Sequence, residues 1–470
     1  MTLRSPKKVG RHRAGTLNNT GGYFMNAQII TKVKVVVTVK EPGTPCWPCI
    51  NFDYEKETAR ILKIMEAAEP FIKFDVFYYK SSEEAAAVYE QDQQKYDGIL
   101  VLMMANWQDI ELFYARKAKE GGLPVVLADV PYCGSGSMLN RVSFAVRSEG
   151  LPVPMIASMD YEDIAKGVKL FEVIKKMQNT KILVIADKIK EAEQSAASEV
   201  WGCQFVNRTA EDLNRFFETV DAAEAADIVQ KWKTEAADVL EPSDADILES
   251  AKLYLALRQM RDELNADALT VDCLTLSYGD KYTNNTHMYP CLSHAEMSRR
   301  GEVAVCEADI NATLASLVTL YLTSRPGYVS DPVIDTSSDQ IIYAHCVACA
   351  KIYGKDDPRT CKYYIRSHAE DQRGASVQVI FPANEKLTTT MFHFPEREVC
   401  IHSSTSVGNV GGDEGCRSKL AATTKAENLL YNWMPLWHRV TVFGEYRKQF
   451  MNLFKMKQIN VIEEDKELMG

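Results

Sequence analysis

The sequence predicts an α/β protein in which two Rossmann-like, doubly wound domains precede a β-rich C-terminal domain. Three observations support this fold class. Up to Lys355, short apolar runs alternate with helical patterns, as in parallel sheets covered by helices. After Lys355 the pattern changes to short alternating strands separated by polar turns. The chain has 470 residues, 46% of them hydrophobic, which is enough for about three domains with large cores.

The first α/β domain is predicted over residues 29–175, after a basic segment, residues 1–28, that we expect to be a flexible tail. A transit peptide is one alternative for that segment, and an over-long gene start is another, since Met25 sits just before the first expected strand. The apolar runs of this domain predict strands at Lys32–Glu41, Phe74–Tyr79, Asp97–Met104, Pro124–Val130 and Val153–Met159. The patterns between and after them predict helices at 54–67, 81–89, 110–119 and 161–177.

The second α/β domain is predicted over residues 176–350 and carries the candidate metal-binding acids. Strands are expected at Thr180–Asp187 and Asp267–Leu276, separated by a long helical region. The apolar helix expected at Ala308–Thr323 is too hydrophobic for the surface and is therefore predicted to be buried. The β-rich domain, residues 351–470, is predicted to form an antiparallel sheet or a barrel.

Composition excludes several classes of protein. The net charge of −10 gives no electrostatic footprint for nucleic acid. The purest apolar run, Ile99–Ala105, is far shorter than the ~20 residues that a bilayer requires, so no membrane partner is expected. No apolar segment of a secretory signal follows the basic N-terminus. The twelve cysteines are therefore expected to be reduced thiols in a cytoplasmic protein.

One stretch, Gly301–Cys346, gathers residues with metal-binding chemistry. Glu307 follows an apolar strand-like run, Asp331 follows a Pro-Gly break, and His345 ends an extended segment. His438 precedes another strand-like run much later in the chain. In α/β proteins, binding and catalytic sites are commonly formed by side chains at the ends of strands. Two carboxylates with one or two imidazoles suit Mn²⁺ or a similar divalent cation.

Each of these residues also has a structural interpretation. Glu307 could be an acid that the helix dipole favours at a helix N-terminus. Asp331 and the nearby Asp335 could be plain turn residues. A lone histidine beside an apolar run, such as His345 or His438, is often a core group with satisfied hydrogen bonds. The metal site is therefore predicted from the combination and not from any single residue.

The cysteine motifs are weaker signals. Cys46-Trp-Pro-Cys49 has redox spacing, but it is not placed directly at a helix start as a thioredoxin-type motif requires. The thiols of Cys346, Cys349 and Cys361 could hold zinc, but no fourth ligand follows at finger spacing. Neither motif is predicted to carry the function.

Residues 267–447 resemble the L-fucose isomerase / L-arabinose isomerase superfamily, and its fucose isomerase-like members in particular. The first half of the chain is similar to that family only in architecture. The words that carry the resemblance are DALTVDCL, CEADINATL, DPVIDTSSDQIIYAHC, YYIRSHAEDQRGASVQV, GCRSKL and HRVTVFGEYR.

The resemblance implies a metal-dependent aldose–ketose isomerase that acts on an open-chain sugar through a metal-stabilised enediolate. The sugar would be a pentose, a deoxyhexose or a modified hexose, and the cofactor Mn²⁺ or another divalent cation. Glu307 and Asp331 then match the catalytic, metal-binding acids, with Asp335 the fallback for the second acid. His438 matches the histidine ligand. His345 falls where arabinose isomerases have a fourth ligand that fucose isomerases lack.

The resemblance also implies substrate contacts and an assembly. Four residues are candidates for binding the sugar: Arg366, His368, Arg417 and Trp437. A homo-oligomer, trimer or hexamer, is expected, in which the loop at Cys46 or Trp107 of a neighbour reaches the site. Two alternatives remain open, a non-catalytic sugar-binding protein and an epimerase or lyase that uses the same enediolate chemistry.

Overall fold

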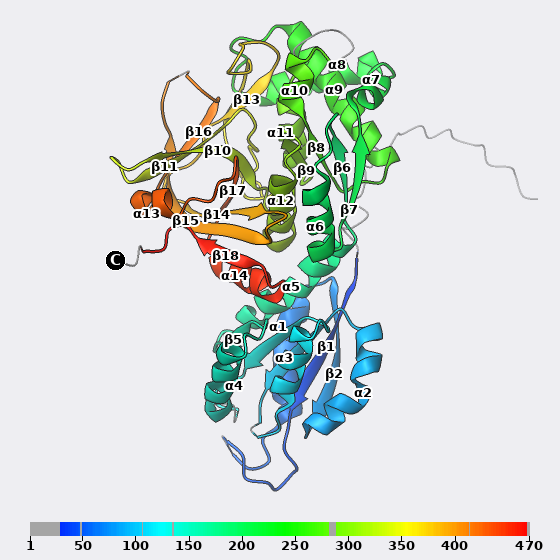
Figure 1. Cartoon of the computed structure of the whole chain (residues 1–470), viewed down its shortest axis with the longest axis vertical. Helices are drawn as coiled ribbons and strands as arrows, with labels where there is room; N and C mark the ends of the chain where they lie inside the picture. Colours follow the sequence, from blue (N-terminus) through cyan, green and yellow to red (C-terminus); the bar gives the residue numbers. More distant parts are fainter. Residues whose placement is uncertain are drawn as a thin grey trace, which may run out of the picture.

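The computed structural model describes residues 29–47, 49–105, 107–133, 136–281, 288–412 and 414–467. It confirms the predicted fold class, with two parallel-sheet α/β units followed by a β-rich unit (Figure 1). The predicted tail, residues 1–28, lies outside the described residues. Among the residues that are described, no helix has the length and the apolar content needed to cross a bilayer.

The first unit is a five-stranded parallel sheet with the strand order β2-β1-β3-β4-β5. The central strand β3 is buried along its whole length, as expected for a parallel strand covered on both faces. Its strands are β1 (Thr31–Thr38), β2 (Ile72–Tyr79), β3 (Gly98–Met103), β4 (Val125–Asp129) and β5 (Met155–Ala157). Its helices are α1 (Tyr54–Ala68), α2 (Ser82–Lys95), α3 (Ile110–Lys119), α4 (Gly136–Ser148) and α5 (Glu162–Gln178).

The second unit is a four-stranded parallel sheet with the order β7-β6-β8-β9. Its strands are β6 (Lys181–Ile185), β7 (Gln204–Arg208), β8 (Ala268–Val271) and β9 (Val303–Cys306). The long helical region consists of α7 (Ala210–Phe217), α8 (Ala222–Glu235) and α9 (Asp244–Glu263). Capping boxes at Thr209 and Ser243 start α7 and α9. The remaining helices are α6 (Glu191–Trp201), α10 (Cys273–Tyr278), α11 (Cys291–Arg299) and α12 (Ile310–Thr323).

The strand predicted at Asp267–Leu276 was wrong in its second half. Strand β8 ends at Val271, and helix α10 begins at Cys273. The backbone N–H of Asp272 still donates to Ile185 of β6, whereas the N–H of Leu276 donates to the carbonyl of Asp272 and so closes the first helical turn. An apolar run alone does not separate a short buried strand from a helix that follows it.

The third unit is a closed antiparallel barrel in the order β14-β17-β10-β11-β16-β15, with β15 pairing back to β14. Its strands are β10 (Tyr328–Asp335), β11 (Gln340–His345), β14 (Lys386–His393), β15 (Glu398–Asn409), β16 (Ser418–Thr423) and β17 (Arg439–Phe443). Strand β18 (Asn460–Glu463) pairs in parallel with β15. A separate hairpin joins β12 (Tyr363–Arg366) to β13 (Ser376–Val379), and the helices are α13 (Ala426–Asn432) and α14 (Arg447–Met456).

The barrel begins at Tyr328, earlier than the predicted domain boundary at residue 351. The hairpin β10–β11 pairs with β17 and β16 and not with the second parallel sheet. The reason is that the chain leaves the parallel sheet at the Pro326-Gly327 break, after α12. This placement brings the end of β9 and the first barrel strands together (Figure 1).

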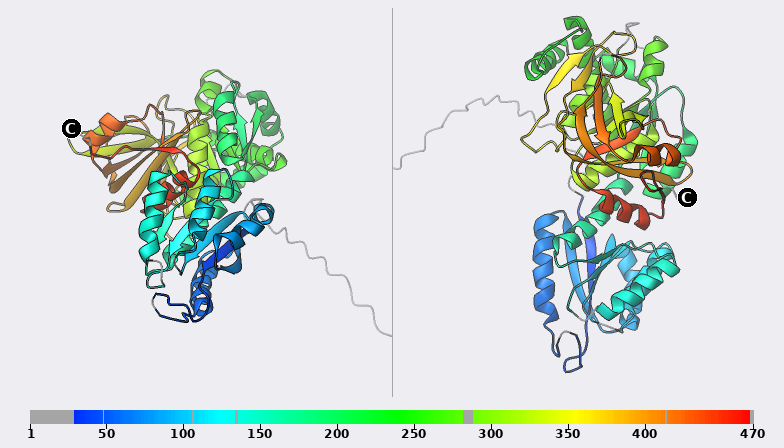
Figure 2. Two further views of the ribbon diagram at one scale, coloured as in Figure 1. Left: turned by 60° about the horizontal axis from the view of Figure 1, so that its bottom comes forward. Right: turned by 90° about the vertical axis from the view of Figure 1, so that its left-hand side faces the viewer.

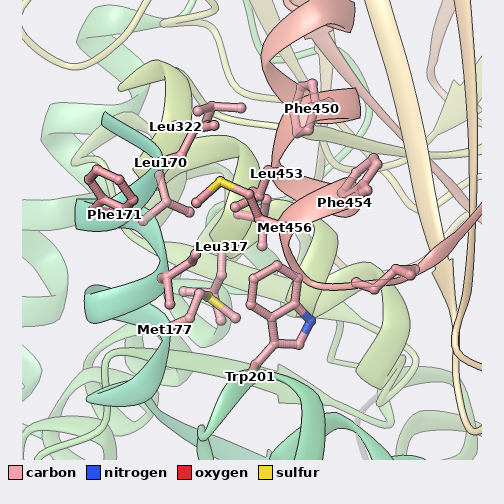
Figure 3. Close-up of a cluster of buried hydrophobic side chains, with 14 of the residues drawn as sticks. Leu170, Phe171, Met177, Trp201, Leu317, Leu322, Phe450, Leu453, Phe454 and Met456 are labelled. Carbon is pink, nitrogen blue, oxygen red and sulfur yellow. The ribbon is translucent and has the colours of Figure 1, made fainter. Parts of the chain in front are cut away.

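A buried apolar cluster joins the three units. Figure 3 shows side chains from α5, α6, α12 and α14 in contact at this junction, and Figure 2 shows α14 lying between the barrel and the first unit. The labelled members are Leu170, Phe171, Met177, Trp201, Leu317, Leu322, Phe450, Leu453, Phe454 and Met456. Helix α12 belongs to this cluster and also packs against β9, β14 and β17, so it fixes the second sheet against the barrel.

Candidate metal centre

Glu307 lies in a tight turn between strand β9 and helix α12. Both Glu307 and Ala308 have positive φ angles, 64° and 46°, a region that costs non-glycine residues free energy and that is often found at functional sites. The N–H of Ala308 donates to Val271 of the neighbouring strand β8 and holds this turn in place. The turn directs the half-buried carboxylate of Glu307 towards the barrel, where it meets two histidines.

His438 immediately precedes strand β17 and is fully buried. Its Nδ1 lies 2.8 Å from Oδ2 of Asp309, and because an ionised carboxylate only accepts, Nδ1 carries the proton. Its Nε2 lies 3.6 Å from Oε2 of Glu307 and 3.6 Å from Oδ1 of Asp331. In the described part of the chain this buried nitrogen has no hydrogen-bond partner. Such a carboxylate–histidine pair is the usual way of presenting an imidazole lone pair to a metal ion.

Asp309 was not identified from the sequence. Its Oδ1 accepts from the N–H of Ala312 and caps helix α12, while Oδ2 holds His438. The capping role has a sequence signal, because aspartate directly before an apolar helix is a typical N-cap. The second role has none, since it depends on a residue 129 positions away.

His345 ends strand β11 and is buried beside the same carboxylate. Its Nε2 lies 4.0 Å from Oε1 of Glu307, and its ring centroid lies 5.6 Å from that of His438. Ligand atoms of Glu307, His345 and His438 all lie within 4.8 Å of one another, so the three residues could hold a metal ion. However, Nδ1 of His345 accepts from the N–H of Val347 at 3.1 Å. A neutral imidazole with an accepting Nδ1 carries its proton on Nε2, so His345 faces Glu307 as a donor.

Asp331 lies in strand β10, opposite Ala344 of β11. Burial, reinforced by the nearby charge of Glu307, raises its pKa to about 6. For Glu307, burial alone would raise the pKa, but the nearby imidazole of His438, whose Nε2 lies 3.6 Å away, outweighs it and lowers the pKa. The environment therefore separates two neighbouring carboxyl groups into one that ionises easily and one that retains a proton more readily, which is the pattern of an acid/base pair.

The pKa values of the two histidines are also shifted in opposite directions. Burial would lower the pKa of His438, but its hydrogen bond to Asp309 and the charges of Asp309 and Glu307 raise it to about 10. For His345, burial and the charge of His438 lower the pKa to about 3. A cation at this position would replace the proton that the acidic groups favour on His438.

The fallback acid Asp335 is the last residue of strand β10, four residues after Asp331. Its carboxylate accepts from the backbone of Ser337 and from the hydroxyls of Ser337 and Ser338, so it closes the turn between β10 and β11. The structure brings Asp331, and not Asp335, to His438.

The four predicted substrate-binding residues differ from one another in burial and in their contacts. His368 is buried and stacked on Tyr289, with ring centroids 3.9 Å apart, and within the described ranges its Nδ1 has no hydrogen-bond partner. Arg417 is buried and donates to the carbonyl and hydroxyl of Ser367. Arg366 forms a bidentate ion pair with Glu241, which engages its guanidinium.

Trp437, directly before His438, is 71% exposed, a large apolar surface beside a polar centre. Three more neighbours of the centre were missed from the sequence. Cys416 lies 3.9 Å from Asp331, Tyr289 donates to Asp371 at 2.7 Å, and the buried His294 lies 3.3 Å from Cys306. Cys416 lies in GCRSKL, one of the segments that carry the resemblance, whereas Tyr289 and His294 come from segments that carry no motif.

The alternative cysteine sites are not formed as metal sites. The described residues contain one group of at least three candidate ligands, Glu307 with His345 and His438, and no thiol belongs to it. Cys346 and Cys349 are buried, and Cys361 is half-buried. The thiol of Cys46 lies 3.3 Å from the hydroxyl of Tyr54, in a loop that precedes α1.

Comparisons with known proteins leave the family open. No protein-family model matches the chain, and no curated protein matches it. Solved structures do match, among them one described as a two-component system response regulator/GGDEF domain protein. That chain is 14% identical, with 62% of this chain and 98% of the other covered and a TM-score of 0.27. A TM-score this low carries no argument about fold or function.

Proposed function

We propose that the protein is a metal-dependent aldose–ketose isomerase that acts on an open-chain pentose, deoxyhexose or modified hexose. One observation carries this proposal: the carboxylate of Asp309 directs the buried Nε2 of His438 at Glu307 and Asp331. Among the described residues this nitrogen has no hydrogen-bond partner. The sequence resemblance to the L-fucose isomerase / L-arabinose isomerase superfamily supplies the reaction class.

The residues present suit a divalent cation such as Mn²⁺. Glu307, Asp331 and His438 would hold it, because two carboxylate oxygens and one imidazole form a hard-to-borderline donor set. When bound, such an ion polarises the carbonyl and hydroxyl oxygens of a sugar and stabilises negative charge that develops on them. Because Nε2 of His345 carries a proton, His345 would not be a ligand of the ion.

The two carboxylates supply the proton transfers that the reaction needs. Isomerisation moves a proton from C2 to C1 and another between the two oxygens. The carboxylates of Glu307 and Asp331 each lie 3.6 Å from His438 Nε2, so both can reach one small substrate. We assign them as the acid/base pair, in line with the opposite shifts of their pKa values.

The surrounding side chains can orient the sugar. His368 offers an imidazole nitrogen for hydroxyl groups, and Trp437 offers an apolar face for the carbon skeleton. Arg417 holds the backbone at Ser367. Arg366, which is paired with Glu241, would support the wall of the site more than the substrate itself.

A homo-oligomer, trimer or hexamer, belongs to this proposal. Trp47 and Trp107 are 60% and 65% exposed. They lie in loops after β1 and β3, at the end of the first unit that is remote from the barrel (Figure 1). Within one chain these loops are far from His438. They would therefore complete the site of another copy, and an interface map with both loops away from every site would remove this part of the proposal.

The test is an assay of a panel of aldoses for ketose formation by metal-stripped protein, with and without added Mn²⁺. We expect turnover that depends on Mn²⁺ and is lost in Glu307→Gln and Asp331→Asn. Asp335→Asn is the matched control, because it makes the same chemical change in the same strand but only at the turn.

Three outcomes would contradict the proposal. Turnover that does not need a metal would remove the role of the cation. An equal loss in Asp335→Asn and Asp331→Asn would place the second acid elsewhere. Tight sugar binding by the metal-loaded protein without conversion of any aldose would favour the sugar-binding alternative.

A further inference from the structure

The loop that carries His438 is held from behind by one arginine. Residues Met434–His438 connect α13 to β17 without regular secondary structure. Arg439, the next residue, donates from Nη1 to the carbonyl oxygens of Leu436 and His438, at 3.2 and 2.9 Å. Its Nη2 donates to the carbonyl of Met434 at 3.0 Å. One guanidinium thus binds the loop at both ends and in its middle.

Arg439 is held in turn by Glu464, directly after strand β18. Oε1 of Glu464 accepts from Nη2 of Arg439 at 2.6 Å and from the N–H of Met434 at 3.2 Å. Oε2 accepts from Nε of Arg439 at 3.3 Å and from Nδ1 of His402 at 2.8 Å. The indole of Trp433 covers the guanidinium, with Cζ 3.8 Å from the ring centroid.

This arrangement is buried and lies on the side of the loop opposite to the candidate metal centre. Arg439, Glu464 and His402 are fully buried. Successive residues of an extended chain point to opposite faces, so His438 faces Glu307 while Arg439 faces the barrel interior. A fully buried ion pair with every donor used gives a rigid geometry, and little is gained from it in stability alone.

We infer that Arg439 and Glu464 are positioning residues that fix the backbone of His438 and thereby set the affinity of the metal centre. This inference rests on the metal site of the proposed function and adds residues that touch neither metal nor substrate. Groups that orient a metal ligand from outside the coordination shell typically change metal affinity by about 10–100-fold. Loosening the Met434–His438 loop would move Nε2 away from Glu307 and Asp331.

The experiment measures Mn²⁺ binding to the full-length, metal-stripped protein from the electron paramagnetic resonance signal of free Mn²⁺. Arg439→Lys keeps the charge but cannot bind three carbonyls and a carboxylate together. Glu464→Gln keeps the size and one acceptor oxygen. We expect each variant to raise the Kd for Mn²⁺ by about 10–100-fold and to alter the visible spectrum of the Co²⁺-substituted centre.

Arg447→Lys is the matched control. Arg447 pairs with Glu463 and Asp465, the residues on either side of Glu464, and so ties down the same C-terminal segment. In the described part of the chain its guanidinium binds Ser403, Glu463 and Asp465 and not the Met434–His438 loop. This variant should therefore lose stability without a change in Kd or in the Co²⁺ spectrum. Circular dichroism confirms that each protein is folded, and if Arg439→Lys does not fold, Glu464→Gln decides.

The outcomes separate this inference from the proposed function. If the wild-type protein binds Mn²⁺ and folded Glu464→Gln binds it equally well with the same Co²⁺ spectrum, the positioning role is overturned. An equal rise in Kd for Arg447→Lys also overturns it, because the effect would then be general destabilisation. Absence of binding at Glu307 and His438 in the wild-type protein contradicts the metal centre itself and the inference with it.

Discussion

At the scale of single residues, Asp309 links the fold to the chemistry. One oxygen caps α12 and the other fixes the tautomer of His438. Asparagine would retain the cap, because it is also a strong N-cap residue, but its amide N–H₂ would then face Nδ1. That contact favours the tautomer with the proton on Nε2, which blocks the lone pair needed by a cation.

We therefore expect Asp309→Asn to weaken Mn²⁺ binding by about 10–100-fold with little change in the free energy of unfolding. Titration calorimetry and urea unfolding measure the two quantities. Asp53→Asn is the matched control, since Asp53 caps α1 in the same way but lies in the first sheet unit. Unchanged Mn²⁺ affinity in Asp309→Asn would show that the carboxylate does not set the tautomer.

His345 gives a second prediction at this scale. Because its Nδ1 accepts from Val347, its Nε2 carries a proton and is not available as a ligand. We expect His345→Gln to bind one Mn²⁺ per chain as the wild-type protein does, but to turn over the sugar more slowly. His438→Gln should lose the metal. Equal loss of metal from both variants, measured by elemental analysis after dialysis, would instead make His345 a ligand.

At the scale of elements, the parallel pairing of β18 with β15 places Glu464 beside His402 and Arg439. Burial would raise the pKa of Glu464, but the hydrogen bond from His402 and the charge of Arg439 lower it from 4.5 to about 2. A lowered carboxyl pKa contributes stability that is fully present above pH 4.5 and is lost as the pH falls towards 2.

Glu464→Gln should therefore lower the free energy of unfolding by about 3–5 kcal/mol at pH 7, because Arg439 is left without its charge partner. The difference in the free energy of unfolding between the variant and the wild-type protein should narrow by about 2 kcal/mol between pH 5 and pH 3, because only the wild-type protein loses the contribution of the ionised Glu464. Urea unfolding at a series of pH values measures this. A difference that stays constant over that range would mean that Glu464 titrates normally in the folded protein.

At the scale of the whole molecule, much of the fold could be predicted because local patterns specify it. The buried strand Gly98–Met103 and the helix Ile110–Lys119 follow directly from apolar runs and helical periodicity. The sequence left open whether these strands form a sheet or a barrel, because closure depends on β17 pairing with β10 and β14 and on β16 pairing with β11. Such pairings between distant segments leave no local pattern.

The same limit applies to the site. Glu307 and His438 could be selected because they flank strand-like runs, and Asp331 because it follows the Pro-Gly break. The family resemblance strengthened the selection. Asp309, Arg439 and Glu464 could not, because their roles arise from contacts across 25 to 129 positions. The candidate metal ligands can thus be selected from the sequence, while the groups that contact them or their loop appear only in the folded chain.

The most direct test of the metal centre is anomalous scattering at the manganese absorption edge from crystals grown with Mn²⁺. We expect one strong peak per chain in contact with Glu307, Asp331 and Nε2 of His438, and no such peak in Glu307→Gln. A peak at another group of residues, or none between Glu307 and His438 in crystals of protein that retains bound Mn²⁺, would contradict the account.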